Sequence, residues 1–102
     1  MKYVVSVDFR CKPQSVAAVA ELLRSALPET RAYPGCQSLD VYFDATTNTY
    51  TALETWDSAD HYRVYLQFRT DQGIAAVVDP LLEGGWDGVV ANIKWLGEKT
   101  TF

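Results

Sequence analysis

The order of alternating and helical hydrophobic patterns restricts the fold of this chain more than any other feature. Residues 2–10 alternate as a β-strand does, and the apolar residues of one face are Tyr3, Val5, Val7 and Phe9. Residues 13–27 then follow a helical period, with Pro13 suited to the first turn. Pro28 is expected to end or kink this helix, because proline removes a backbone hydrogen bond.

Two more strands and a second helix follow. Residues 36–43 and 49–56 alternate again, and the short connection between them predicts an antiparallel hairpin. The second helix is expected to begin at Asp57 or Ser58, either of which can cap it, and to continue to about Arg69.

The C-terminal part mixes helical and breaking signals. Residues 74–82 have apolar side chains at helical spacing, but Gly73 and Pro80 limit them to a short or kinked element. The glycine-rich segment 84–88 predicts a mobile loop. Residues 89–96 predict a fourth strand.

This order of elements predicts an α+β fold of the ferredoxin-like βαββαβ type, an antiparallel sheet with helices on one face. The 102 residues are expected to form one domain, 1–102, with its core over about 1–96 and a tail at 97–102. Because the first and fourth strands have apolar residues on both faces, the uncovered face would expose a patch too large for a monomer. We therefore predict a homodimer whose two sheets pack face to face, as in a dimeric α+β barrel.

Charge and cysteine usage narrow the class of function. The formal charge is −4 and the nine Lys and Arg residues form no run, which argues against nucleic acid as a partner. No apolar stretch is long enough for a membrane helix and the first residues do not resemble a signal peptide, so we expect a cytoplasmic protein without a membrane partner. Cys11 and Cys36 have no metal-ligand spacing, so no metal site is expected and both are predicted to be reduced packing residues.

A motif around the second and third strands is shared with a known family. Arg31 precedes Pro-Gly-Cys at residues 34–36, and Glu54, Trp56 and Ser58 form a Glu-x-Trp-x-Ser pattern. These residues resemble the antibiotic biosynthesis monooxygenase family of dimeric α+β barrels. Glu54 is expected to pair with Arg31 and to have a structural role.

Within this family, the pattern in which five residues separate Trp56 from Tyr62, Arg63 and Val64 is most similar to the branch that oxidises aromatic polyketides in the actinorhodin pathway. The resemblance implies an enzyme without metal, flavin or haem. Such an enzyme deprotonates a phenolic, hydroquinone or anthrone-like substrate, which reacts with O₂ and leaves as a quinone. We therefore expect a cofactor-independent monooxygenase whose partners are a small aromatic substrate and O₂.

The chain departs from the family pattern at several positions. The polyketide branch has an asparagine where this chain has Ala52, and many members have a histidine where it has Tyr65. Ser6 and Leu66 replace two residues that haem degradation needs, so that activity is not expected. The departures leave two alternatives open: an isomerase, cyclase or decarboxylase on the same scaffold, or a small-molecule-binding or stress-response module without chemistry.

The candidates for catalysis are Trp56, Tyr62, Tyr65 and His61. Trp56 can wall a pocket and hold a substrate oxygen through its indole N–H, or it can simply fill the corner between strand and helix. Tyr62 and Tyr65 share one stripe of the second helix and can donate to an oxyanion, or they can form part of the core. His61 is the only histidine of the chain, and histidine is the residue type whose unperturbed pKa lies near neutrality, which suits a general base, but a surface position is the preferred interpretation.

The candidates for substrate binding are Ser6, Asp8, Arg69 and Trp86. Ser6 and Asp8 share a face of the first strand and are expected to enter the pocket as polar anchors. Arg69 is expected at the end of the tyrosine stripe. Trp86 lies among glycines and can form a lid over an aromatic ligand, or it can belong to a plain connection.

Overall fold

The computed structural model describes all residues, 1–102, as four strands and four α-helices. The elements are β1 (Tyr3–Arg10), the 3₁₀ turn η1 (Pro13–Ser15), α1 (Val16–Ala32), β2 (Cys36–Asp44), β3 (Thr49–Trp56), α2 (Ala59–Asp71), α3 (Ile74–Val78), α4 (Gly85–Ala91) and β4 (Lys94–Glu98). The strands form one antiparallel sheet in the order β2-β3-β1-β4. This topology confirms the predicted ferredoxin-like α+β fold.

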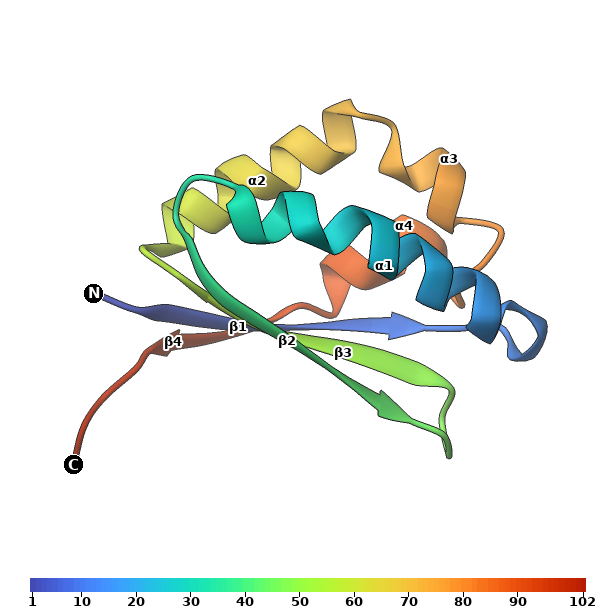
Figure 1. Cartoon of the computed structure of the whole chain (residues 1–102), viewed down its shortest axis with the longest axis horizontal. Helices are drawn as coiled ribbons and strands as arrows, with labels where there is room; N and C mark the ends of the chain where they lie inside the picture. Colours follow the sequence, from blue (N-terminus) through green and yellow to red (C-terminus); the bar gives the residue numbers. More distant parts are fainter.

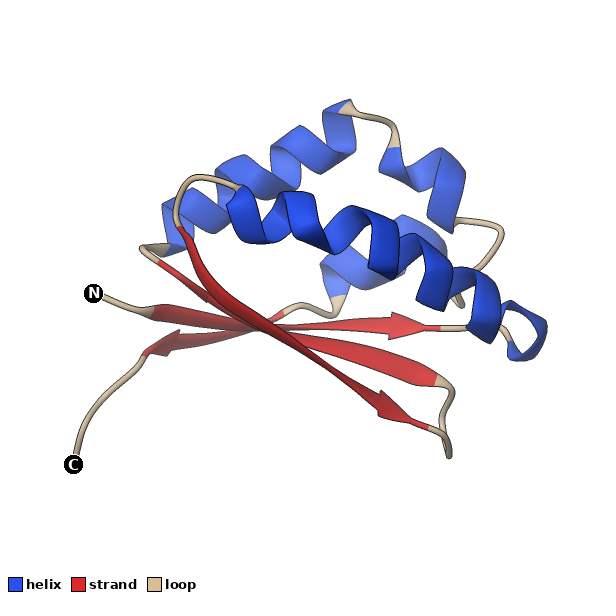
Figure 2. Cartoon of the chain, in the orientation of Figure 1, coloured by secondary structure: helices blue, strands red, loops and turns tan.

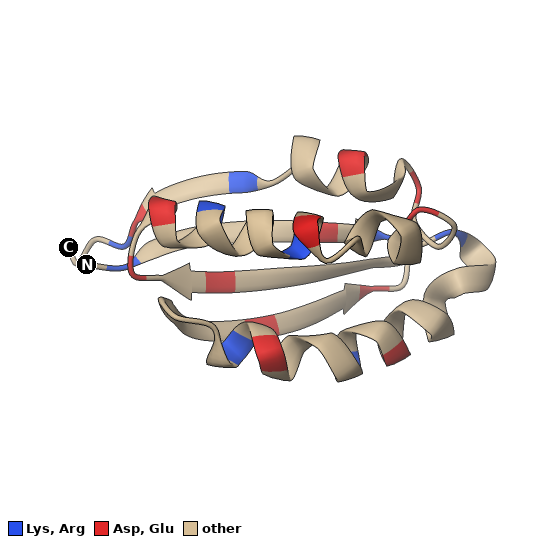
Figure 3. Ribbon diagram, turned by 90° about the horizontal axis from the view of Figure 1, so that it is seen from above, with Lys and Arg blue, Asp and Glu red and all other residues tan.

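The helices cover one face of the sheet and leave the other open (Figure 1 and Figure 2). Alternation along the strands explains this layering, because Val5 and Val7 of β1 and Ala52 and Trp56 of β3 are all buried under the helices. Basic residues do not gather on the helical side of the molecule (Figure 3). None of the helices combines the length and the apolar character that a membrane crossing requires.

Helix α1 continues through Pro28 to Ala32, so the predicted end at residue 27 is wrong. Pro28 is exposed, and its ring lies on the solvent side of the helix. The next turn is anchored by Thr30, which is buried and whose hydroxyl lies 2.6 Å from that of Tyr65. The chain turns instead at Gly35, whose φ of 95° suits glycine.

The predicted loop at 84–88 is also wrong, and the predicted fourth strand exists but begins five residues later than expected. Residues Gly85–Ala91 form α4, and β4 begins only at Lys94. Trp86, Val89 and Ile93 are buried at helical spacing. Short runs of β-branched residues suit a strand or a buried helix equally well, so periodicity alone does not distinguish them.

The open face of the sheet has both polar and apolar side chains. Ser6 and Asp8 lie there because they alternate with the buried residues of β1, and Leu53 of β3 pairs with Ser6. Leu53 and Tyr42 are 38% and 59% exposed. Val89, which was counted in the predicted fourth strand, belongs to α4 and contributes nothing to this face.

The close approach of Gly35 to His61 gives a testable prediction. A Cβ atom on Gly35 would lie 2.6 Å from Cδ2 of His61, whereas one on Gly73, which also has positive φ, would meet nothing within 4 Å. Gly73→Ala is expected to lower the free energy of unfolding by about 1–2 kcal/mol, the usual cost of the left-handed conformation. Gly35→Ala should lower the free energy of unfolding by clearly more than Gly73→Ala does, and urea unfolding measures both.

The double variant Gly35→Ala, His61→Gly, measured against His61→Gly alone, serves as the control for this contact, because it removes both the ring and the Cβ atom of His61, which would lie 2.8 Å from the new methyl group. The excess cost over Gly73→Ala should then disappear. If Gly35→Ala and Gly73→Ala lower the free energy of unfolding by the same amount, the contact with His61 does not affect stability.

Candidate functional site

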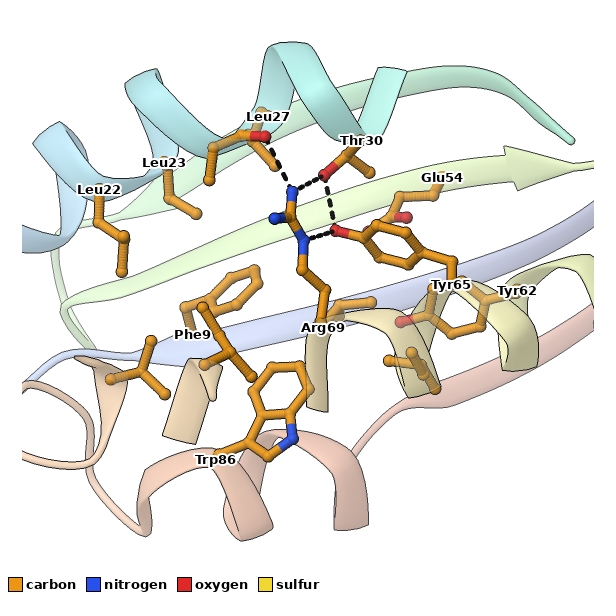
Figure 4. A pocket seen from close by; sticks show the side chains of 15 residues that line it. Phe9, Leu22, Leu23, Leu27, Thr30, Glu54, Tyr62, Tyr65, Arg69 and Trp86 are labelled. Atoms are coloured by element: carbon orange, nitrogen blue, oxygen red, sulfur yellow. Dashed lines mark hydrogen bonds between the residues drawn. The ribbon is translucent and has the colours of Figure 1, made fainter. Parts of the chain in front are cut away.

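A cavity of about 50 Å³ lies between the helices and the covered face of the sheet (Figure 4). The polar residues that line it are Thr30, Glu54, Tyr62, Tyr65 and Arg69, and the other ten are apolar. These polar groups come from α1, β3 and α2, so only the folded chain brings them together. An apolar space with a few convergent polar groups is the usual form of a ligand or catalytic site.

Glu54 is the buried acid of this cavity. It has an inward position on β3 and is 4% exposed. Its Oε1 atom accepts a hydrogen bond from Nε1 of Trp56 at 3.0 Å. Burial raises the pKa of Glu54 to about 7, and the hydrogen bond from Trp56 only partly opposes the shift. Near neutral pH the carboxyl group exists in both protonation states, which suits a general acid or base.

The expected ion pair between Glu54 and Arg31 does not form. Nη2 of Arg31 donates to the carbonyl oxygen of Leu39 at 3.2 Å. The three ion pairs of the protein join other residues. Glu54 therefore faces the cavity without a cation, which is the physical reason that its pKa is raised and not lowered.

Trp56 lies behind Glu54 and does not line the cavity. Its side chain has no exposed surface, and its N–H group is already engaged by Glu54. The ring packs against Tyr62 and Tyr65, with centroid distances of 5.4 and 5.1 Å. The hypothesis that this indole holds a substrate oxygen is therefore corrected. Through its hydrogen bond the indole instead orients the carboxyl group of Glu54.

Tyr62 supplies a hydroxyl group that is not used elsewhere in the chain. Its ring is buried and lines the cavity. Every fully enclosed polar side-chain atom of the protein has a hydrogen-bond partner. The Tyr62 hydroxyl has no hydrogen-bond partner, so it is not fully enclosed and borders the open space toward which it is turned in Figure 4. Burial, and then the charges of Glu54 and Tyr65, raise the pKa of Tyr62 well above its usual range. This phenol stays neutral and can donate a hydrogen bond to a bound oxyanion.

Arg69 and Tyr65 belong to a network that joins α2 to α1. Nε of Arg69 donates to the Tyr65 hydroxyl at 2.8 Å, and Nη2 donates to Oγ1 of Thr30 at 3.0 Å (Figure 4). The guanidinium also contacts Glu29 at 2.8 Å and Gln72 at 3.0 Å. Burial raises the pKa of Tyr65, and the hydrogen bonds from Arg69 and Thr30 oppose it. Both residues line the cavity, but their polar groups are occupied in holding the helices together.

Ser6 and Asp8 lie outside the cavity, which corrects their expected places in the pocket, and His61 lies at the surface, the position preferred for it from the sequence. His61 is exposed at the start of α2, where Nδ1 lies 2.6 Å from Oγ of Ser58. Ser6 and Asp8 are on the open face of the sheet because the period of a strand is two residues, and Asp8 accepts a hydrogen bond from Thr51 at 2.6 Å.

Trp86 forms a wall of the cavity and is not part of a loose loop. It lies in the first turn of α4, where its backbone N–H donates to Oδ1 of Asp79 at 2.8 Å. Its indole is buried, and Nε1 makes only a long contact of 3.4 Å with Oγ1 of Thr70. The lid interpretation is therefore corrected, since the residue is held within a helix.

Glu54 and Thr30 line the cavity but were not among the site residues predicted from the sequence. The inward position of Glu54 could have been found from its place between Ala52 and Trp56, which point to the same face. The place of Thr30 could not have been found, because it depends on the continuation of α1 beyond Pro28. No group of three or more His, Cys, Asp or Glu side chains is arranged as metal ligands, and both cysteines are free thiols.

Residues 2–70 match the family model described as antibiotic biosynthesis monooxygenase. The chain belongs to the antibiotic biosynthesis monooxygenase family. The matched region ends within α2 and includes all five polar residues of the cavity, Thr30, Glu54, Tyr62, Tyr65 and Arg69. Trp86, which closes the cavity from α4, lies beyond it.

Solved structures of this fold come from several bacteria. The NE2512 protein of unknown function from Nitrosomonas europaea is 20% identical, with a TM-score of 0.77 over 99% of this chain and 92% of that chain. A protein of Chloroflexus aurantiacus J-10-fl assigned to the antibiotic biosynthesis monooxygenase family is 22% identical, with a TM-score of 0.67 over 100% and 97%. Rv0793 from Mycobacterium tuberculosis is 26% identical, with a TM-score of 0.59 over 80% and 84%. No curated protein matches the chain. The likeness to the first two structures is one of fold.

Proposed function

We propose that this protein is a cofactor-independent monooxygenase that oxidises a phenolic or hydroquinone substrate to a quinone with O₂. The observation that carries the proposal is Glu54, a buried carboxyl group with a pKa of about 7 that faces an apolar cavity without a cation. Family membership supports the same class of reaction. The similarity of Trp56 and Tyr62-Arg63-Val64 to the polyketide-oxidising branch adds to that support.

The first step is a proton transfer from the substrate hydroxyl to the carboxylate of Glu54. An ordinary phenol has a pKa of about 10, roughly three units above that of Glu54, so the transfer is uphill by about 4 kcal/mol. A hydrogen bond from the Tyr62 hydroxyl to the phenolate oxygen offsets about 1.5–3 kcal/mol of this cost. Glu54 is thus the general base and Tyr62 the oxyanion donor.

The second step is the reaction of the anion with O₂. With a hydroquinone, one oxygen atom forms a bond to a ring carbon in place of its hydrogen, and the other leaves as water when the O–O bond breaks. The ring gives up four electrons and becomes a hydroxyquinone. The substrate is itself the reductant, so the balance needs no other co-reactant. The apolar residues around the cavity exclude water from the anion.

Oxygen uptake by the purified protein tests this function. With hydroquinone we expect one O₂ consumed per hydroxyquinone formed, label from ¹⁸O₂ in the product, and no turnover under strict anaerobiosis. Turnover without O₂ would instead indicate an isomerase, cyclase or decarboxylase that uses the same acid–base groups.

The variant Tyr62→Phe tests the oxyanion donor. It removes one hydrogen bond that forms fully only with the anion, so kcat should fall by about 10²-fold. Tyr42→Phe, which removes an exposed hydroxyl on the open face of the sheet, is the matched control and should keep wild-type activity. Wild-type kcat in Tyr62→Phe would contradict the assigned role.

A binding module without chemistry is the second candidate, and the packing of Trp56 against Tyr62 favours it. The two rings lie 5.4 Å apart between centroids, and the indole is completely buried, as in a filled core. Saturable binding of phenol by a protein that consumes no O₂ would support this candidate over the enzyme.

We further propose that the protein is a cytoplasmic homodimer that pairs through the open face of the sheet. Exposed Leu53 and Tyr42 on this face support the pairing, although the apolar area is smaller than the sequence predicted. The two free cysteines fit a cytoplasmic location. Sedimentation equilibrium should give about twice the 11.4 kDa mass of one chain, and a monomer at micromolar concentration would contradict the pairing.

A further inference from the structure

We infer that the site accepts phenols with a single ring and that Trp86 excludes substrates with fused rings. This inference rests on the function proposed above and narrows its substrate class. It follows from the size of the cavity and from the way in which each part of its wall is held.

The cavity is too small for any aromatic ring in its present form. Its volume is about 50 Å³, whereas an apolar cavity of about 150 Å³ is known to bind benzene in an engineered protein. A substrate with one ring therefore needs roughly 100 Å³ more space. Part of the wall must move outward to provide it.

Helix α3 is the part of the wall that can yield. It has five residues, begins after Gly73 with a φ of 83°, and buries only Val78. A helix this short gains little stability from its own hydrogen bonds, and elements of low local stability are the ones that open. Ile74 and Val78 are its two cavity residues. The carbonyl group of Val78 accepts hydrogen bonds from Leu81 and Leu82, so it is the outward movement of the half-buried Ile74 that enlarges the cavity.

The other walls are held firmly. Helices α1 and α2 are tied together by the buried Arg69 network. The segment after α3 is fixed to β1 by backbone hydrogen bonds from Lys12 to Leu81 at 3.0 Å and from Glu83 to Arg10 at 2.8 Å. We therefore expect the cavity to grow at the N-terminal end of α3.

Trp86 belongs to this fixed part. Its helix packs through the buried Val89, and its indole is only 9% exposed. Its backbone N–H donates to Asp79, the C-cap residue of α3, so this end of α3 belongs to the fixed part and only the end at Gly73 and Ile74 yields. In Figure 4 the indole lies on the opposite side of the lining residues from Leu22 and Leu23 of α1. The indole therefore limits the width of the cavity across from α1, and we expect a second fused ring to clash with it.

Isothermal titration calorimetry with phenol and 1-naphthol tests this selection, because binding is measured without turnover. The wild-type protein should bind 1-naphthol at least ten-fold more weakly than phenol. Trp86→Ala should bind 1-naphthol at least ten-fold more tightly than the wild type does. Phe43→Ala, which removes an aromatic ring outside the cavity, should keep the wild-type ratio. Trp86→Leu keeps more of the packing and replaces Trp86→Ala if that variant does not fold.

Equal binding of the two phenols by the wild type, or an unchanged ratio in the Trp86 variants, would overturn the inference, as would a wild type that binds neither. Size selection and the reaction fail separately. The expected binding ratio without O₂ uptake would leave the selection by Trp86 in place and refute the monooxygenase.

Discussion

Replacement of Glu54 by glutamine is expected to lower kcat/KM with a phenolic substrate by about 10²–10⁴-fold, the range that a general base usually provides. Glutamine keeps an oxygen that can accept the hydrogen bond from Nε1 of Trp56, but it cannot take a proton. Oxygen uptake measures the loss. Glu98→Gln, at an exposed carboxyl group of β4, is the matched control and should keep full activity.

The pH dependence gives an independent readout of the same group. Because Glu54 must be ionised to act as a base, wild-type kcat/KM should rise with pH and level off above about 7, its pKa in the folded protein. The residual activity of Glu54→Gln should lack this rise. A wild-type profile that rises near pH 4 to 5 instead would contradict the assignment.

The Glu54→Gln variant should be at least as stable to unfolding as the wild type. The pKa of Glu54 is raised above its ordinary value of 4.5, so the folded chain holds this proton more tightly than the unfolded chain. Its contribution to stability is therefore complete below pH 4.5 and is lost as the pH rises to about 7, a total of about 3 kcal/mol. At pH 8 the glutamine variant should be more stable than the wild type by up to that amount in urea unfolding. A variant that is less stable at pH 8 would show that the carboxylate has a favourable partner.

Replacement of Arg69 by alanine is expected to lower the free energy of unfolding by about 3 kcal/mol. The side chain is buried and donates to Tyr65 and Thr30, as well as to a backbone carbonyl of α1, that of Ala26, at 3.0 Å. Hydrogen bonds of a charged donor contribute about 1.5–3 kcal/mol each, and the remaining contact between Thr30 and Tyr65 limits the total loss. Urea unfolding at pH 7 measures the change.

Two variants separate the causes of this loss. Arg24→Ala removes an exposed arginine of α1 that pairs with Glu21, and it should change stability by less than about 1 kcal/mol. Arg69→Lys keeps the charge but not the planar set of donors, so it should recover less than half of the loss. Full recovery by lysine would show that charge, and not the donor geometry, joins the two helices.

The stripe of α2 could be predicted from spacing alone. Tyr62, Tyr65 and Arg69 are separated by three and four residues, which places them on one side of a helix, and all three line the cavity. The pattern did not show that the guanidinium of Arg69 would be occupied by α1. That depends on Thr30, which is six residues before a strand in the sequence and is brought to α2 only by packing.

The sequence by itself determined the order of the strands and which side chains face the helices, because a strand repeats every two residues and a helix every 3.6. This was enough for the fold of β1, β2, β3 and α2, and for the side of the sheet on which Glu54 lies. It was not enough for residues 85–98, where both periods fit the same apolar run.

Only the tertiary structure decided which polar groups have partners. It showed that Arg31 donates to a backbone carbonyl and leaves Glu54 without a cation, that Trp56 is committed to Glu54, and that the Tyr62 hydroxyl is free. The physical reason is that the pKa of a carboxyl group and the availability of a donor depend on burial and on neighbours within a few ångströms. Those neighbours come from segments far apart in the chain, and local sequence patterns do not specify them.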